Sequence, residues 1–207
     1  MYAATSATLV DLIRHGQPAG GQKYRGHLDD PLSPLGWSQM RRAIGEQEHW
    51  DAVVCSSLER CRAFAEEVGM ARGIPVYVEP RFKEINFGDW EGMKAEEVLA
   101  RYGSALGAFW LDGDANPPPG GETVTAFYTR VAAAWDHWLD QLWGQHLLLV
   151  SHGGVIRMSL AHALGLPPVH MMARLDVAYA SRSRIRISRR SDGGQLATLV
   201  SHGDPSP

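Results

Sequence analysis

The sequence is poor in lysine and in long apolar runs. Its lysines are Lys23, Lys83 and Lys94, against a total of 20 basic residues, and the formal net charge is −3. A chain with this charge has no bulk attraction for nucleic acid or for an anionic membrane. No apolar stretch approaches the length of a membrane span, and the first residues lack the pattern of a signal peptide. We therefore expect a cytoplasmic protein that binds neither nucleic acid nor membrane.

Cysteine is scarce as well, with two residues in the whole chain. Cys55 falls in an apolar run and Cys61 in a helical pattern, and neither has a partner at the spacing of metal ligands. The nine histidines include no HExxH motif and no tight cluster. We expect reduced, buried thiols, no metal site and no cofactor.

Short apolar runs alternate with helical patterns along the chain. Runs typical of strands buried on both faces cover residues 8–14, 52–55, 75–78 and 146–150. Patterns typical of helices begin near Ser33 and Ser57 and cover 123–143 and 154–163. This alternation predicts an α/β fold, a three-layer α/β/α sandwich with a mostly parallel mixed sheet. A turn signal at Asp192-Gly193-Gly194 predicts an antiparallel hairpin near the end.

One segment interrupts this rhythm. Residues 92–122 contain a short helical pattern, the aromatic pair Phe109 and Trp110, and the run "NPPPGGE". Such a stretch is typical of an insertion beside a site. We predict one domain over 1–207 that carries a small cap-like insertion at about 92–122.

Basic and polar side chains follow several of the predicted strands. Arg14-His15-Gly16 ends the first, Arg60 lies in the helix after the second, and His152 precedes a helix N-terminus. The carboxyl ends of parallel strands meet at one edge of a sheet, where helix N-termini and arginine side chains bind phosphate. A nearby arginine also keeps an imidazole neutral and nucleophilic, and Gly16 permits a close backbone approach. The pattern predicts a phosphate site.

Four motifs, "LIRHG", "SSLERC", "EINFGDWEG" and "LLLVSHGGVIR", resemble in their order and spacing the histidine phosphatase superfamily, the phosphoglycerate-mutase-like proteins. The resemblance implies a metal-independent phosphomonoesterase in which His15 becomes a phosphohistidine. It implies that Glu84 protonates the leaving oxygen and then activates water. Phosphate binding is carried over to Arg14, Gln17, Arg60, His152 and Gly153. Many relatives have Glu where this chain has Gln17.

Several residues compete for these roles. Glu91 is the rival acid to Glu84, and we predict that it is structural because the family acid lies upstream of "FGDWEG". Arg62 is predicted to be a surface charge. His202 lies in a second "VSHG" that no helix follows, so we predict a tail residue. The arginines at 182–190 alternate with isoleucine and predict the solvated face of an edge strand.

The segments "GGQKYRGHLDDPLSPLGWSQM" and "SSLERCRAFAEEV" resemble bacterial α-ribazole-5′-phosphate phosphatases, which act late in cobalamin synthesis. This resemblance implies a sub-site for a flat base that uses Tyr24, Arg25 and the aromatics near Phe109 and Trp110, although core packing explains those aromatics equally well. A broad-specificity phosphatase, a phosphoglycerate mutase and a non-catalytic phosphate-binding module remain alternatives. Mutases usually carry Trp and Asn shortly after RHG, where this chain has "GQPAGGQKYRG".

Overall fold

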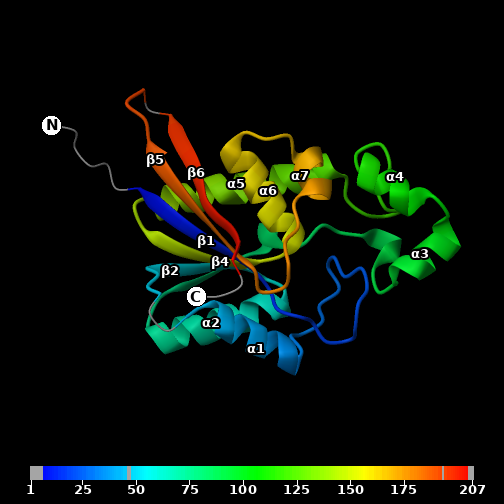
Figure 1. The fold of residues 1–207 in the computed structure, drawn as a ribbon, viewed down its shortest axis with the longest axis horizontal. Coiled ribbons are helices and arrows are strands. Elements are labelled where there is room, and N and C mark those ends of the chain that lie inside the picture. The colour runs from blue at the N-terminus through cyan, green and yellow to red at the C-terminus, as the bar shows by residue number, and fades with distance from the viewer. Residues whose placement is uncertain (1–6, 46–47, 193, 205–207) are drawn as a thin grey trace.

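A single six-stranded sheet, in the order β3-β2-β4-β1-β5-β6, forms the centre of the protein (Figure 1). The computed structural model describes residues 7–45, 48–192 and 194–204. Its strands are β1 (Thr8–Arg14), β2 (Ala52–Ser56), β3 (Val76–Glu79), β4 (His146–Ser151), β5 (Arg182–Arg189) and β6 (Gln195–Asp204). The first four pair in parallel, and β5 and β6 are antiparallel to their neighbours. The predicted mixed, mostly parallel sheet is confirmed.

Helices cover both faces of this sheet. They are α1 (Pro34–Ala43), α2 (Glu59–Arg72), α3 (Ala95–Tyr102), α4 (Ala105–Leu111), α5 (Val124–Gln141), α6 (Gly153–Leu164) and α7 (Pro168–Arg174), with 3-10 turns η1 (Pro80–Phe82) and η2 (Gly88–Trp90). In Figure 1, α1 and α2 lie on one face, α5 to α7 on the other, and α3 and α4 extend beyond one end. The three-layer prediction is confirmed. The sequence did not indicate α4 and α7, which are too short, at seven residues each, for a clear periodicity.

Alternate residues of the central strands enter two separate apolar layers. Val10 and Leu12 of β1 pack on the α5 side with Phe127, whereas Ile13 packs on the α1–α2 side with Phe64. Strands buried on both faces in this way require the continuous apolar runs seen in the sequence.

The two cysteines behave as buried apolar residues. Both have free thiols, as expected from the sequence. Burial raises the pKa of Cys55 to about 12 and also raises that of Cys61. Both thiols are therefore protonated and unreactive near neutral pH.

The edges of the sheet differ from the prediction. The run at 75–78 is not buried on both faces, because β3 is an edge strand with Val78 43% exposed. The arginine-bearing strand is not an edge, because β5 lies between β1 and β6. Arg182 and Arg184 form ion pairs with Glu48 instead of facing solvent alone. The predicted hairpin pairing is present, while Gly193 of its turn lies outside the described residues.

Asp11 is fully buried in the middle of β1, and its carboxylate explains why the Arg184 side chain points toward the sheet. Its carboxylate accepts hydrogen bonds from Trp50 Nε1 at 2.8 Å, His146 Nε2 at 3.0 Å, and Arg184 Nε and Nη2 at 2.6 and 2.8 Å. Burial alone would raise the pKa of Asp11, but these hydrogen bonds and the charge of Arg184 hold it well below its usual range. The ion pair ties β1 to β5 at the middle of β1, where Asp11 and Arg184 are register partners.

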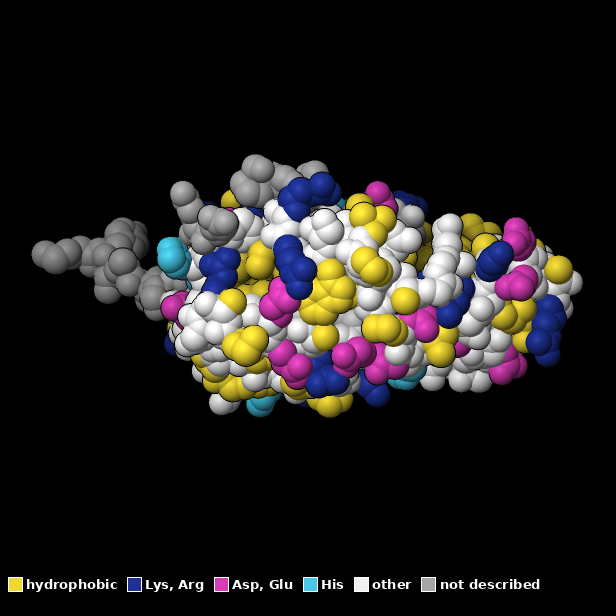
Figure 2. All heavy atoms as spheres, turned by 90° about the horizontal axis from the view of Figure 1, so that it is seen from below, with side chains coloured by type: hydrophobic (Ala, Val, Ile, Leu, Met, Phe, Trp, Pro, Cys, Tyr) yellow, Lys and Arg dark blue, Asp and Glu magenta, His cyan; other side chains and the backbone are white. Residues whose placement is uncertain are grey.

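The outer surface shows mixed charge on the face that carries α1 and α2. Acidic and basic side chains interleave there (Figure 2), and some form ion pairs such as Arg41–Glu67 and Arg62–Glu66. Within the described ranges, no helix is long and apolar enough to cross a membrane.

Candidate active site

The carboxyl ends of β1 and β4 bring the two predicted histidines together. Arg14 pairs in register with Ser151, and the backbone N–H of His15 donates to Ser151 O at 2.9 Å. The rings of His15 and His152 lie edge to face with their centroids 5.1 Å apart. Both side chains are buried, His152 completely. This pairing follows directly from two adjacent parallel strands that end at the same level.

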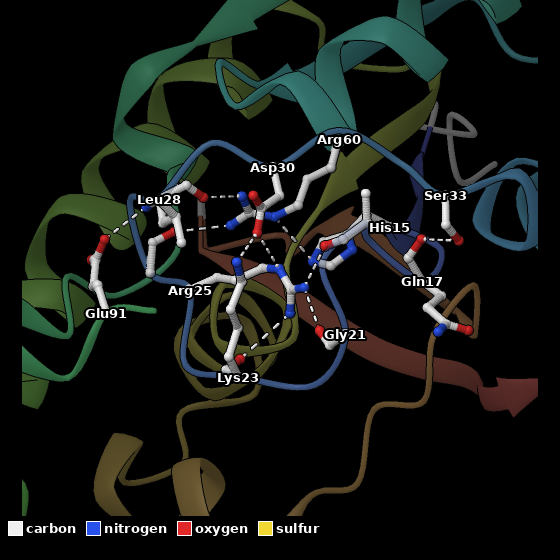
Figure 3. Close-up of polar contacts among 12 residues, drawn as sticks. His15, Gln17, Gly21, Lys23, Arg25, Leu28, Asp30, Ser33, Arg60 and Glu91 are labelled. Carbon is white, nitrogen blue, oxygen red and sulfur yellow. Dashed lines mark hydrogen bonds and ion pairs between the residues drawn. The ribbon is translucent and has the colours of Figure 1, made fainter. Parts of the chain in front are cut away.

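Arg60 lies beside the His15 ring (Figure 3). It is the second residue of α2, and its Nε lies 3.3 Å from His15 Nε2. Its Nη1 and Nη2 donate to Leu28 O and Gly26 O, both at 2.9 Å, so the guanidinium is held in one orientation. His15 Nδ1 lies 2.8 Å from Gly16 O and donates to it, which makes Nε2 the unprotonated nitrogen.

The surroundings keep both imidazoles neutral. Burial lowers the pKa of His15 well below its usual range, and the positive charges of Arg60 and Arg14 lower it further. Burial and Arg60 lower the pKa of His152 in the same way. The Nε2 of His152 is 2.7 Å from the hydroxyl of Ser56, which fixes the ring. A neutral His15 whose Nε2 carries no proton is a competent nucleophile, and this Nε2 accepts a hydrogen bond from Arg60 Nε.

Glu84 lies at the N-terminus of α6. Its Oε2 accepts from the backbone N–H of Gly154 and its Oε1 from that of Ile85, both at 3.0 Å. Arg130 holds the backbone on which it sits, donating to the carbonyls of Lys83 and Glu84 at 2.7 and 2.8 Å. These hydrogen bonds hold the Glu84 carboxylate in a defined position at the wall of the cavity, beside the N-terminus of α6.

A cavity of about 740 Å³ joins these groups, and it brings together most of the predicted site. The predicted residues that line it are Arg14, His15, Tyr24, Arg25, Arg60, Glu84 and Gly153. His152, a predicted phosphate contact, does not line it and is fully buried against the His15 ring. Of the aromatic pair, Trp110 lines the cavity, whereas Phe109 is buried against Phe87 and Trp90.

Two residues predicted to contact phosphate or substrate, Gln17 and Arg25, form hydrogen bonds within the protein instead. Gln17 does not line the cavity, and Figure 3 shows its side chain directed away from the His15 ring. Its backbone N–H donates to Gln39 Oε1 at 2.8 Å and its carbonyl accepts from Ser33. Arg25 pairs with Asp30 at 3.0 Å and donates to backbone carbonyls of its own loop, so it holds the loop that forms one wall.

The close backbone approach that Gly16 permits is between its own loop and helix α1. A Cβ on Gly16 would overlap the backbone of Gly36 in α1, and a Cβ on Gly36 would lie 2.9 Å from the nitrogen of Gln17. The two glycines therefore let α1 pack directly against the loop that follows His15.

The rival residues are also accounted for. Glu91 accepts from the backbone N–H groups of His27 and Leu28, both at 2.7 Å, and is structural as predicted. Arg62 pairs with Glu59 and Glu66 on the surface, also as predicted. His202 is not a tail residue, because β6 continues to Asp204. Its ring lies 2.7 Å from Ser183 Oγ and donates to Asp176 O at 2.8 Å.

Arg157 and Tyr179 are among the cavity residues that the sequence did not predict. Arg157 lies one helical turn after Gly153, inside the motif "SHGGVIR", so its position in a recognised motif could have identified it. Tyr179 belongs to no motif. The guanidinium carbon of Arg14 lies 4.1 Å from its ring centroid, and the Tyr179 and His15 rings are 5.7 Å apart. Among the described residues, no three His, Cys, Asp or Glu side chains form a group that could hold a metal.

A buried neutral histidine, two fixed guanidinium groups, a helix N-terminus and a carboxylate at one cavity define a site for phosphoryl transfer. Comparison with known proteins leads to the same class. Residues 10–203 match the model of the histidine phosphatase superfamily (branch 1), and the chain belongs to that superfamily. It is a phosphoric monoester hydrolase of the histidine phosphatase type.

The similar proteins are phosphatases with different substrates. The chain is 32% identical over 163 residues to the adenosylcobalamin/alpha-ribazole phosphatase of Salmonella typhimurium, covering 75% of this chain and 79% of the relative. It is 32% identical to the glucosyl-3-phosphoglycerate phosphatase of Mycolicibacterium vanbaalenii, covering 88% and 85%. The solved structure of a mycobacterial glucosyl-3-phosphoglycerate phosphatase superposes with a TM-score of 0.85 at 27% identity, covering 95% of this chain and 99% of that structure.

Proposed function

We propose that this chain hydrolyses small phosphomonoesters through a phosphohistidine on His15. The observation that carries the proposal is the unprotonated His15 Nε2, held next to Arg60 at the cavity. Nε2 attacks phosphorus in line, the ester P–O bond breaks, and the leaving oxygen takes a proton from Glu84. The Glu84 carboxylate then removes a proton from water, the resulting hydroxide forms a bond to phosphorus, and the P–N bond breaks to release phosphate.

The positive groups of the site stabilise the transferred phosphoryl group. Arg14 and Arg60 are placed to bind its oxygens, and the N-terminus of α6 at Gly153 adds the partial positive charge of a helix end. A phosphate contact by His152 stays a prediction, because its buried ring does not line the cavity. A role for Gln17 stays a prediction, and it requires a change in the side-chain direction seen in Figure 3. The proposal needs no metal or cofactor.

The proposed substrate is α-ribazole 5′-phosphate, in line with the name of the Salmonella relative. Tyr24 and Trp110 line the cavity and supply flat surfaces for its base, and α3 and α4, within the 92–122 segment, would act as the cap. A carboxylate-bearing phosphoester is a second candidate, favoured by Lys23, Lys94 and Arg157 on the cavity wall. We place the reaction in the cytoplasm, with no nucleic-acid or membrane partner.

The first test is phosphate release from p-nitrophenyl phosphate in the presence of EDTA. His15→Ala removes the nucleophile, and His170→Ala changes an exposed histidine on α7 as the matched control. We expect turnover in the native chain and the control, and its loss in His15→Ala. Turnover that survives in His15→Ala, or that needs a divalent metal, would contradict the proposal. Phosphate binding without turnover of any ester would favour the non-catalytic binding module.

The substrate is tested next on the same preparation. We expect the highest kcat/KM with α-ribazole 5′-phosphate, with glucosyl-3-phosphoglycerate as the rival substrate. A higher value for the rival would assign the second candidate. Interconversion of 2- and 3-phosphoglycerate without net phosphate release would assign a mutase instead.

A further inference from the structure

Arg157 lies directly beside the proposed phosphoryl pocket. Its half-buried side chain lines the cavity, and its Nε donates to Leu175 O at 2.7 Å. A Cβ built on Gly153 would lie 3.4 Å from Arg157 Nη1 and 3.5 Å from Arg14 Nε. The guanidinium groups of Arg14 and Arg157 therefore flank the same glycine. Arg14 is the one proposed to bind the phosphoryl group, and Arg157 lies next to it.

The cavity carries more positive charge than a phosphoryl group requires. Six cationic side chains line it, against the two carboxylates of Glu84 and Glu96. Lys23 and Arg25 share Asp30, and Lys94 lies 3.7 Å from Glu96. Arg14 and Arg60 are assigned to the phosphoryl oxygens. Arg157 is the remaining cationic side chain of the cavity, with neither a carboxylate partner nor an assigned role.

Within the described ranges, the one hydrogen bond of the Arg157 side chain is that from Nε, and no carboxylate forms an ion pair with its guanidinium. Its orientation is nevertheless fixed, because Nε is bonded to Leu175 O. A partly desolvated guanidinium with two free, oriented nitrogens is matched best by a planar anion that accepts two hydrogen bonds.

We propose that Arg157 forms a second anion subsite, which binds a carboxylate on the leaving group of the substrate. The inference rests on the proposed function, since the phosphoryl group must occupy the pocket at His15. Among phosphomonoesters with small leaving groups, the site then binds most tightly those that carry a carboxylate close to the ester oxygen.

The test compares two ligands that differ at one group, 3-phosphoglycerate and glycerol 3-phosphate. Their Kd values are measured by titration calorimetry in the His15→Ala background, where neither ligand is consumed. We expect 3-phosphoglycerate to bind about 10- to 100-fold more tightly, the range for a hydrogen-bonded charge pair. With Arg157→Gln the ratio falls to within about three-fold. Arg157→Lys retains part of the preference because it keeps the charge but loses the planar pairing.

Arg62→Gln, on the surface of α2, is the matched control and should keep the parental ratio. Melting temperatures show that each variant is folded, and if Arg157→Gln is not, Arg157→Lys supplies the comparison. A parental ratio near one, or a preference that survives Arg157→Gln, overturns the proposal. An equal loss for both ligands also overturns it, because Arg157 would then bind the phosphoryl group. Failure of the proposed function is seen separately, as p-nitrophenyl phosphate turnover that persists in His15→Ala.

Discussion

A methyl group added at Gly154 should disable Glu84, the proposed general acid, by displacing its carboxylate while leaving that residue unsubstituted. Gly154 is the second residue of α6, and its N–H donates to Glu84 Oε2. In Gly154→Ala the new Cβ would overlap Glu84 Oε1, and it would lie 3.1 Å from Glu84 Cδ and 3.0 Å from Cε1 of the fully buried Phe127. Carbon atoms pack at about 3.5–4.0 Å, so the carboxylate must move by roughly 0.5–1 Å.

The expected loss follows from this displacement. General acid catalysis contributes about 10²- to 10⁴-fold, and a misplacement of about 1 Å can cost about 10²-fold. We expect kcat/KM for an alkyl phosphate to fall about 100-fold. The decrease for p-nitrophenyl phosphate should be smaller, because nitrophenolate leaves without a proton and kcat/KM reports the steps up to phosphoenzyme formation. Alanine also favours the helix by up to about 1 kcal/mol, which offsets part of the strain.

The assay is steady-state kinetics on both substrates, with thermal denaturation of each variant. Gly107→Ala in α4 is the control, since a Cβ there meets nothing within 4 Å. A folded Gly154→Ala that keeps its alkyl phosphatase activity would show that Glu84 does not act from this position. Equal losses on the two substrates would show that its role is not that of an acid.

Three further predictions concern stability and pH. Asp11→Ala leaves donor atoms of three buried or half-buried side chains without their acceptor and should lower the free energy of unfolding in urea by about 3–5 kcal/mol at pH 7. A loss below about 1 kcal/mol would refute this prediction. Because the pKa of Asp11 is lowered on folding, its contribution is full above about pH 4 and is lost as the pH falls further. Gly36→Ala forces α1 away from Gln17 and should lower Tm, at a cost of about 1–3 kcal/mol, and an unchanged Tm would contradict the close packing. The lowered pKa of His15 keeps it neutral below pH 6.5, so the acid limb of the kcat/KM profile should lie below that value, and a limb at or above it would mean that His15 is not the nucleophile.

The class of fold and the centre of the site could be predicted from the sequence. Continuous apolar runs can be satisfied only by strands covered on both faces, and that condition leads to a layered parallel sheet. Arg14-His15, Arg60 and His152 each follow such a strand, so parallel pairing alone brings them to one edge. These features depend on backbone geometry and periodicity, which are encoded locally.

Only the tertiary structure decided which side chains face each other across elements. The order of the strands made β5 an interior strand and turned Arg184 inward to Asp11. The packing of α1 explained Gly16, and the course of its loop directed Gln17 away from the cavity. Arg157 and Arg14 come from distant segments and meet at Gly153. Such contacts depend on long-range topology, and identical local sequences with another strand order would place different partners there.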